Sequence, residues 1–180
     1  MFSSESVLRF WFEESTPEQH FRRDSAFDER IRERFGTLHR AVAQGECSAW
    51  RDTPPGRLAE IIVLDQFSRN LYRDDARAFA FDGMALVLAQ EAVRAGVDRA
   101  LSPGQRAFLY MPYMHSESPA MHAEALRLFD QPGLENNHAF ELKHKAIIDR
   151  FGRYPHRNAV LGRQSTPEER AFLLEPGSSF

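Results

Sequence analysis

The amino-acid sequence predicts an all-α fold, and three observations support that prediction. Apolar residues recur at intervals of three and four along the chain, which is the spacing of one face of an α-helix. No stretch alternates apolar and polar residues for long enough to indicate a β-strand. In the second half of the chain, three segments place a hydroxyl residue before proline, which is typical of a helix start. These starts are Ser102-Pro103, Ser118-Pro119 and Thr166-Pro167.

Four helices are expected in the first half of the chain. The second of them carries an apolar stripe and is followed by Gly45, a residue suited to a C-terminal cap. The third opens at Thr53-Pro54 and is apolar on almost every face from Leu58 to Phe67, so we expect it to be central and buried. The expected spans are residues 4–12, 25–43, 54–67 and 75–95.

Four more helices are expected in the second half. Gln105 and Glu169 each complete a capping box, and Gly152 follows the longest helix of this half. The expected spans are residues 103–111, 119–131, 135–151 and 166–175. Short loops between about eight helices favour antiparallel pairs, in a bundle or in a solenoid. We expect one helical domain over residues 1–175 and a loose tail over residues 176–180.

Composition and charge narrow the classes of function. A net charge of -3 indicates no bulk attraction to nucleic acid or to anionic membranes. The longest wholly apolar run covers only residues 84–89, whereas a membrane-spanning helix needs about 20 apolar residues. The single cysteine, Cys47, excludes an internal disulfide framework and fits the reducing cytoplasm. We therefore expect a cytoplasmic protein without nucleic-acid or membrane partners and without a cofactor, and the oligomeric state stays open.

A carboxylate stands on the apolar stripe of the third helix. Asp65 follows Leu58, Ile61 and Ile62 at helical spacing, so its side chain is expected to face the core. A buried carboxylate needs a partner, and Arg69 lies one turn further on. Asn70 and Arg73 continue the polar side of this segment. The simpler interpretation is an ion pair at a helix end beside a solvated basic turn.

Three histidines stand out. His122 and His144 lie on apolar stripes, where either can be a hydrogen-bonded core residue. His115 begins the corner His115-Ser116-Glu117, which has the groups of an acid and base site but also those of an ordinary polar turn. Both Glu-x-x-His spacings of the chain lie on one expected helix and face different directions. We therefore predict no metal site; its first ligands would be His115, Glu117 and His144.

Residues 143–163 form the most basic segment, with six Lys or Arg residues against one acidic residue, a local charge of +5. Gly152 and Pro155 interrupt its helical pattern, so the polar side chains that follow lie on a turn. Such a turn can hold a carboxylate or a phosphate. In the alternative interpretation, these cations pair with acidic residues elsewhere or cap helix carbonyls. The residues concerned are Arg153, His156, Arg157 and Asn158.

The chain resembles a bacterial family of helical proteins, domain of unknown function 924, over nearly its whole length. The resemblance rests on residues 64–73, 114–117, 150–158 and 161–163. Ser68 stands where the family leads us to expect proline, and Ser118 where it often has aspartate. The family has no established activity, so the resemblance implies a fold: antiparallel helix pairs in a tetratricopeptide-like, right-handed stack.

Three functions compete at this stage. In the first, a pocket binds a small anion or the acidic end of a peptide, with the set Arg69, Asn70, Arg73, His144, Arg153, His156, Arg157 and Asn158. In the second, a hydrolase-like enzyme uses His115 or His156 as general base, oriented by Glu117 or Asp65, with arginines stabilising the developing anion. In the third, a scaffold presents exposed aromatic residues such as Phe2, Phe21 and Tyr72 to a partner.

Overall fold

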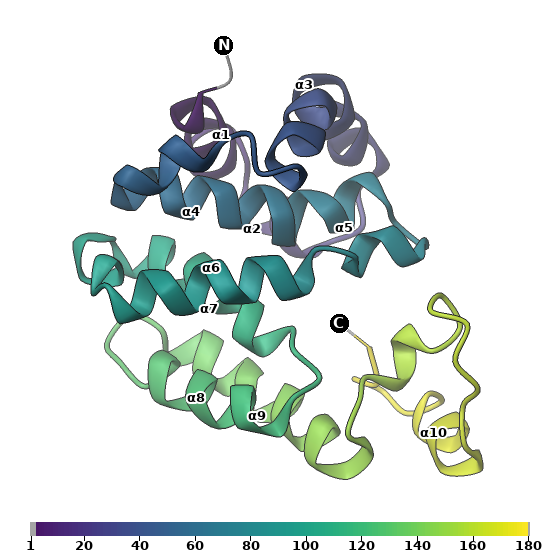
Figure 1. Ribbon diagram of the computed structural model, residues 1–180. Coiled ribbons are helices and arrows are strands. Elements are labelled where there is room, and N and C mark those ends of the chain that lie inside the picture. Colours follow the sequence, from purple (N-terminus) through teal and green to yellow (C-terminus); the bar gives the residue numbers. More distant parts are fainter. Residues whose placement is uncertain (1–2, 180) are drawn as a thin grey trace.

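The computed structural model describes residues 3–179, and it confirms the all-α prediction: this part of the chain contains no strand. Met1, Phe2 and Phe180 lie outside the described residues. Successive helices lie in layers from one end of the molecule to the other (Figure 1). The helices are α1 Ser4–Phe12, α2 Pro17–Phe21, α3 Ser25–Ala43, α4 Pro54–Ile62, α5 Ser68–Leu71, α6 Asp82–Arg94, α7 Pro103–Met114, α8 Pro119–Phe129, α9 Glu135–Phe151 and α10 Pro167–Phe172.

Local capping chemistry starts several of these helices. The side chains of Ser102 and Thr166 form capping boxes at α7 and α10, as the sequence predicts. Thr16 forms a third capping box at the short helix α2, which the periodicity did not indicate because five residues are too few to show a stripe. Ser118 precedes α8 but its side chain makes no capping hydrogen bond.

The fourth predicted helix begins later than expected. Asp75 accepts a hydrogen bond from the backbone N–H of Arg77 and caps a 3₁₀ turn, Ala76–Phe79, instead of the α-helix. The helix α6 itself starts at Asp82. Phe79 and Asp82 therefore lie at a corner between two elements and not along the side of one helix.

The third predicted helix is central and buried, as expected. It continues from α4 through a π-helical turn, Val63–Phe67, into α5. All five side chains of the π turn are buried, including the carboxylate of Asp65. Helices α1, α6 and α7 pack against α4, and α3 packs against α5. π turns are rare and occur often at functional sites, so this element directs attention to the side chains that it carries.

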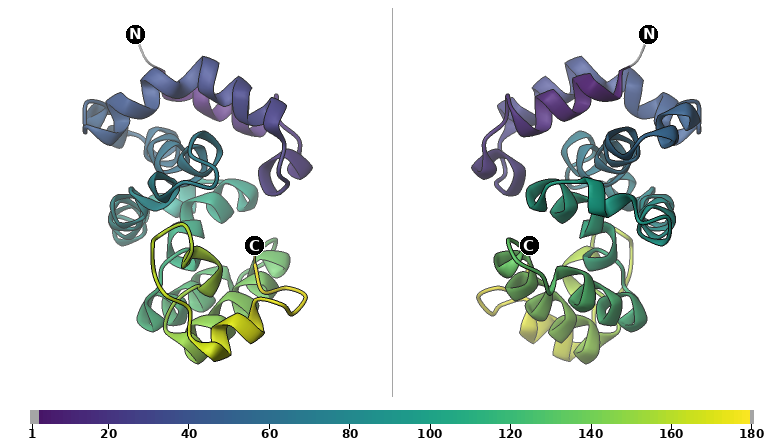
Figure 2. Two further views of the ribbon diagram at one scale, coloured as in Figure 1. Left: turned by 90° about the vertical axis from the view of Figure 1, so that its right-hand side faces the viewer. Right: turned by 90° about the vertical axis from the view of Figure 1, so that its left-hand side faces the viewer.

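The C-terminal segment folds back beside the helices that precede it. Gly152 ends α9 in the left-handed region, at φ 68°, and the chain then reverses direction. Figure 2 shows this segment lying against the α8 and α9 layer. Tyr154 forms a small second core with Ile147 and Ile148 of α9, and Phe151 and Phe172 pack against it. The segment thereby brings its basic side chains toward the end of α7.

Near the end of the chain, the Ser178 hydroxyl donates a hydrogen bond to the Leu173 carbonyl, 3.2 Å away. Within residues 3–179, no helix combines the length and the apolar character that crossing a membrane requires.

Candidate functional site

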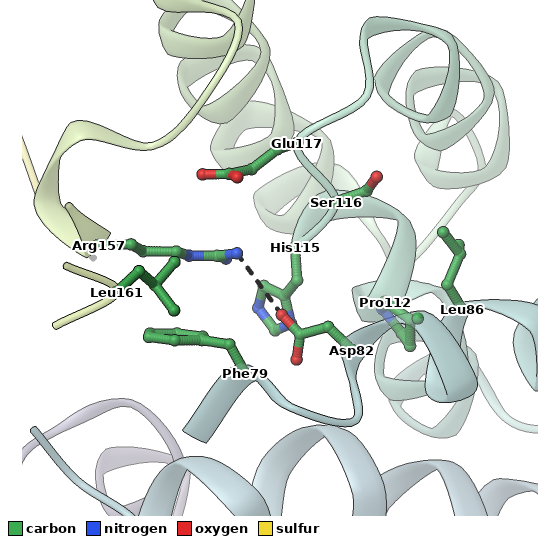
Figure 3. A pocket seen from close by; sticks show the side chains of 10 residues that line it. Phe79, Asp82, Leu86, Pro112, His115, Ser116, Glu117, Arg157 and Leu161 are labelled. Carbon is green, nitrogen blue, oxygen red and sulfur yellow. Dashed lines mark ion pairs between the residues drawn. The ribbon is translucent and has the colours of Figure 1, made fainter. Parts of the chain in front are cut away.

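A cavity of about 310 Å³ opens where three corners of the chain meet (Figure 3). One corner is the 3₁₀ turn with the start of α6, the second is the end of α7, and the third is the turn after Tyr154. The lining residues are Phe79, Asp82, Gly83, Leu86, Pro112, His115, Ser116, Glu117, Arg157 and Leu161. Two of the three segments that the sequence singled out, around His115 and Arg157, therefore meet directly at this cavity.

Asp65 holds His115 from behind the cavity wall. Its Oδ1 lies 2.7 Å from Nδ1 of His115, although the two residues are 50 positions apart. Because an ionised carboxylate only accepts, Nδ1 carries the proton and the neutral ring presents Nε2 as an acceptor. Gln66 donates a hydrogen bond to the other carboxylate oxygen. Asp65 is completely buried, whereas 16% of the His115 side chain is exposed.

Arg69 connects this pair to the cavity wall. Its Nη1 donates to the Asp65 backbone carbonyl at 2.8 Å and lies 3.2 Å from the Asp65 carboxylate. The same guanidinium makes two hydrogen bonds to Asp82, at 2.8 and 2.9 Å. The prediction that Arg69 would partner Asp65 is correct. Arg69 itself does not line the cavity, whereas Asp82 does.

Arg157 is the cation of the cavity. Its guanidinium lies between the rings of Phe79 and Tyr154, 4.6 and 4.5 Å from their centroids. Only 8% of the side chain is exposed, yet its ion pair with Asp82 is long, at 3.5 Å. Its Nε has no hydrogen-bond partner among the described residues. Figure 3 shows the guanidinium pointing into the space that Asp82 and His115 also face.

The carboxylate of Glu117 is held by donors from the C-terminal segment. Arg163 donates two hydrogen bonds to its carboxylate, at 2.6 and 2.9 Å, and the backbone N–H of Tyr154 donates a third at 2.8 Å. This arrangement ties the C-terminal segment to the corner between α7 and α8. Glu117 therefore lines the cavity as a carboxylate whose charge Arg163 already balances. The carboxylate that orients the His115 ring is Asp65.

Burial and neighbouring charges shift the pKa values of these groups. Burial raises the pKa of the Asp65 carboxyl, but His115 and Arg69 outweigh that effect and hold the pKa well below its ordinary value. Burial lowers the pKa of His115, and Asp65 offsets this only in part. Burial also lowers the pKa of Arg157, and the like charge of Arg69 adds to that effect. At neutral pH the site thus contains ionised Asp65, neutral His115 and a guanidinium whose charge is poorly compensated.

Several predicted ligand residues lie elsewhere. Asn70 and Arg73 both bind the carboxylate of Asp28 on α3, with contacts of 2.6 to 2.8 Å. Arg153 and Asn158 bind Glu169 of α10, so they hold the C-terminal segment together. None of the four lines the cavity. Their pairing follows the simpler interpretation, in which these polar side chains bind acidic residues elsewhere in the fold.

The remaining histidines are also outside the cavity lining. Nδ1 of His144 lies 2.8 Å from the carbonyl of Phe140, and burial lowers its pKa to about 3. His156 packs against the Tyr154 ring, and burial lowers its pKa to about 4. His122 is a hydrogen-bonded core residue, 2.6 Å from Glu141 and 2.8 Å from the Ser116 carbonyl. Within residues 3–179, no three His, Cys, Asp or Glu side chains gather closely enough to hold a metal ion.

Sequence reasoning missed Phe79, Asp82, Leu86, Leu161 and Arg163 as site residues. Asp82 stands in the first turn of a helix, where acidic residues are common, so nothing marks it out locally. Arg163 belongs to the basic segment, and nothing in the sequence distinguishes it from the other basic residues there. In each case the functional signal is a partner distant in sequence, which periodicity does not reveal.

Fold and site together define a helical protein with a polar cavity where corners of its helix layers meet. The chain belongs to the family described as bacterial protein of unknown function (DUF924), whose model matches residues 7–177. It is similar to the solved structure of a protein of unknown function from Agrobacterium tumefaciens, with 38% sequence identity and a TM-score of 0.90. The match covers 95% of this chain and 96% of that one. A comparison with curated proteins finds no match.

Proposed function

We propose that the cavity binds a small anion, with Arg157 as the residue that receives it. The observation that carries the proposal is a guanidinium with 8% of its side chain exposed, whose ion pair with Asp82 is 3.5 Å long. Within residues 3–179 its Nε has no hydrogen-bond partner. A buried charge of this kind is costly unless something compensates it. A bound carboxylate would supply the missing charge and bidentate hydrogen bonds.

The charges around the cavity favour an anion with one negative charge. Asp82 is held by both Nη atoms of Arg69, and Glu117 by both Nη atoms of Arg163. Asp65 is held by His115 and Arg69. Arg157 is the cation left with a weak pairing, so it can balance one charge but not the two of a phosphate monoester beside two carboxylates.

The cavity also has an apolar side. Phe79, Leu86, Pro112 and Leu161 line it beside the polar groups. A volume of about 310 Å³ is at the lower end of ordinary small-molecule sites. These features suit a short carboxylic acid with an apolar body, or the carboxyl end of a peptide.

The proposed location is the cytoplasm, because a buried free cysteine, Cys47, fits a reducing compartment.

Calorimetric titration with butyrate tests this proposal, with inorganic phosphate as the comparison anion. The wild-type protein should bind butyrate, and Arg157→Gln should lose at least about tenfold in affinity. Arg94→Gln is the matched control, because that arginine is 82% exposed and lies outside the cavity lining. Equal affinity of wild type and Arg157→Gln would contradict the proposal, and tighter binding of phosphate would contradict the single-charge argument.

A hydrolase-like enzyme is a second candidate function. The observation that favours it is the 2.7 Å contact between Asp65 and His115 at the cavity wall. The scaffold interpretation has weaker support in the described residues: Phe21 is 67% exposed, but Tyr72 is half-buried beneath the Arg77 guanidinium. Phe2 lies outside the described residues.

A further inference from the structure

We propose that His115 is the general base of an ester hydrolysis in this cavity and that Asp65 is its positioning residue. The substrate class is a short-chain carboxylic ester, whose carbonyl oxygen faces Arg157 and whose apolar group packs on the Leu86 and Leu161 side. This inference rests on the proposed anion pocket. It makes the second candidate function specific by naming its base, the carboxylate that orients the base, and its class of substrate.

His115 is the histidine placed to act as the base. His115 lines the cavity, and Asp65 holds its Nδ1, so Nε2 is the ring nitrogen that can accept a proton. His156 does not line the cavity, and its ring packs against Tyr154. A general base must reach the proton that it removes, directly or through one water. Of the two histidines considered from the sequence, His115 alone meets that requirement.

Asp65 orients the His115 ring. A neutral imidazole is a base at Nε2 only while Nδ1 carries the proton. The Asp65 carboxylate fixes that tautomer, and Gln66 and Arg69 hold the carboxylate in turn. The π turn that carries Asp65 is buried on all sides, so the carboxylate has little freedom to move. Asp65 therefore acts through His115 and does not touch the substrate.

Ester hydrolysis needs a group that stabilises the negative charge developing on the substrate. His115 Nε2 takes a proton from water while the water oxygen forms a bond with the acyl carbon. The carbonyl oxygen takes up one negative charge, and the poorly paired guanidinium of Arg157 stabilises it. The C–O bond to the leaving alcohol then breaks, and the imidazolium returns its proton to the alkoxide. The product is a carboxylic acid, which loses its remaining proton to water at neutral pH. The resulting carboxylate is the anion that the proposed pocket binds.

The pH dependence of this reaction follows from the groups around His115. Only the neutral ring is a base, so activity should fall as the pH drops through the pKa of His115, which burial places below the ordinary 6.5. The charged and titratable groups that face His115 from the surrounding elements are Asp65, Arg69, Asp82, Glu117, His144, His156 and Arg157. Replacing Asp65 with asparagine removes the attraction that raises this pKa, so the acidic limb should move to lower pH.

The primary test measures hydrolysis of p-nitrophenyl acetate, butyrate and hexanoate against pH. We expect the wild-type protein to accelerate at least one of these esters, with inhibition by butyrate. His115→Gln and Asp65→Asn should each reduce kcat at least about a hundredfold. The matched control His138→Gln, on α9 outside the cavity lining, should keep wild-type activity. Thermal unfolding of each variant shows whether it is folded.

A second measurement does not depend on the choice of ester. Diethyl pyrocarbonate transfers a carbethoxy group to an unprotonated imidazole nitrogen, and mass spectrometry locates the product. His115 should react in the wild-type protein, more slowly in Asp65→Asn, and more slowly when butyrate is bound. Hydrolysis of p-nitrophenyl phosphate in place of the esters would overturn the substrate class.

The outcomes separate this inference from the proposed function. Butyrate binding that depends on Arg157, without turnover of any ester, would overturn the inference and leave the anion pocket standing. Turnover that survives His115→Gln, or an acidic limb that does not move in Asp65→Asn, would overturn the assigned roles. Loss of butyrate binding as well would remove both proposals.

Discussion

The Asp65 carboxylate and the His115 imidazole lie 2.7 Å apart at the wall of the cavity, although 50 residues separate them in the chain. Asp65 belongs to a π turn inside the central helix, and His115 is the C-cap residue of α7. A π turn takes in one residue more than an α turn, which changes the direction in which the next side chains point. The central helix can thus keep Leu64 and Phe67 in the core and still offer a carboxylate to α7.

Replacing the cavity arginine should separate binding from stability. Arg157→Met removes a buried and poorly paired charge, while Asp82 keeps its two hydrogen bonds from Arg69. We expect the free energy of unfolding without ligand to stay unchanged or to rise by about 1 to 2 kcal/mol. Butyrate should no longer stabilise the variant. Urea unfolding with and without butyrate measures both effects, and a loss of more than about 2 kcal/mol would show that Arg157 serves the fold instead.

Buried His39 should contribute to acid unfolding. Burial lowers its pKa from 6.5 to about 4, and its Nε2 lies 2.7 Å from the Ser68 hydroxyl. Because the folded-state pKa is the lower one, its stability contribution is present above pH 6.5 and is lost as the pH falls toward 4. The loss is on the order of 3 kcal/mol.

Urea unfolding between pH 7 and pH 4 measures this dependence. His39→Gln should lose correspondingly less stability over that interval than the wild type, whatever its stability at neutral pH. The control is His138→Gln, whose histidine is half-buried on α9. The same pH dependence in wild type and His39→Gln would assign the acid sensitivity to other groups.

Gly56 should be intolerant of any side chain. A Cβ at this position would lie 2.0 Å from the carbonyl oxygen of Trp50, which is backbone and has little room to move. Gly56→Ala should therefore lower the free energy of unfolding by about 1 to 3 kcal/mol. Gly36→Ala is the matched control, because a Cβ there meets nothing within 4 Å inside helix α3. That variant should gain about 0.5 to 1 kcal/mol, since alanine favours a helix interior.

Glu117 should control the mobility of the turn that carries Arg157. Its carboxylate accepts the Tyr154 backbone N–H and two hydrogen bonds from Arg163. Glu117→Gln weakens these charge-assisted hydrogen bonds, so amide exchange over residues 153–163 should accelerate about tenfold. Glu124→Gln is the control, because its exposed pair with Arg127 lies on one helix. Unchanged exchange in the Glu117 variant would mean that the second core around Tyr154 holds the turn without this bridge.

Local chemistry accounts for what could be predicted from the sequence. Capping at Ser102 and Thr166, the apolar stripe of α3 and the stop at Gly152 depend on residues within a turn or two of each other. The burial of residues 58–67 follows from their apolar character on every face, and the prediction of a central helix is correct. The same local reasoning did not distinguish an α turn from the π turn at Val63–Phe67, since both have buried apolar neighbours.

The partners of the polar residues required the tertiary structure. Arg69, Arg73, Arg153 and Arg157 look alike in the sequence, but only Arg157 lacks a close carboxylate partner. The carboxylates that pair with the other three arginines belong to α6, α3 and α10. No local pattern specifies these pairings, because an ion pair depends on distance in space and not on separation along the chain.

By itself, the sequence determined an all-helical chain with helices close to their observed positions, because capping and periodicity act over a few residues. It also singled out Asp65, His115 and Arg157 as residues that call for a chemical explanation. Only the tertiary structure decided that Asp65 holds His115, that Asp82 and Phe79 join them, and that Arg157 faces the cavity with its charge poorly balanced. Packing brings together corners of the chain that are far apart in sequence, such as Phe79 and Arg157, which are 78 positions from each other. Burial then sets which charges are compensated.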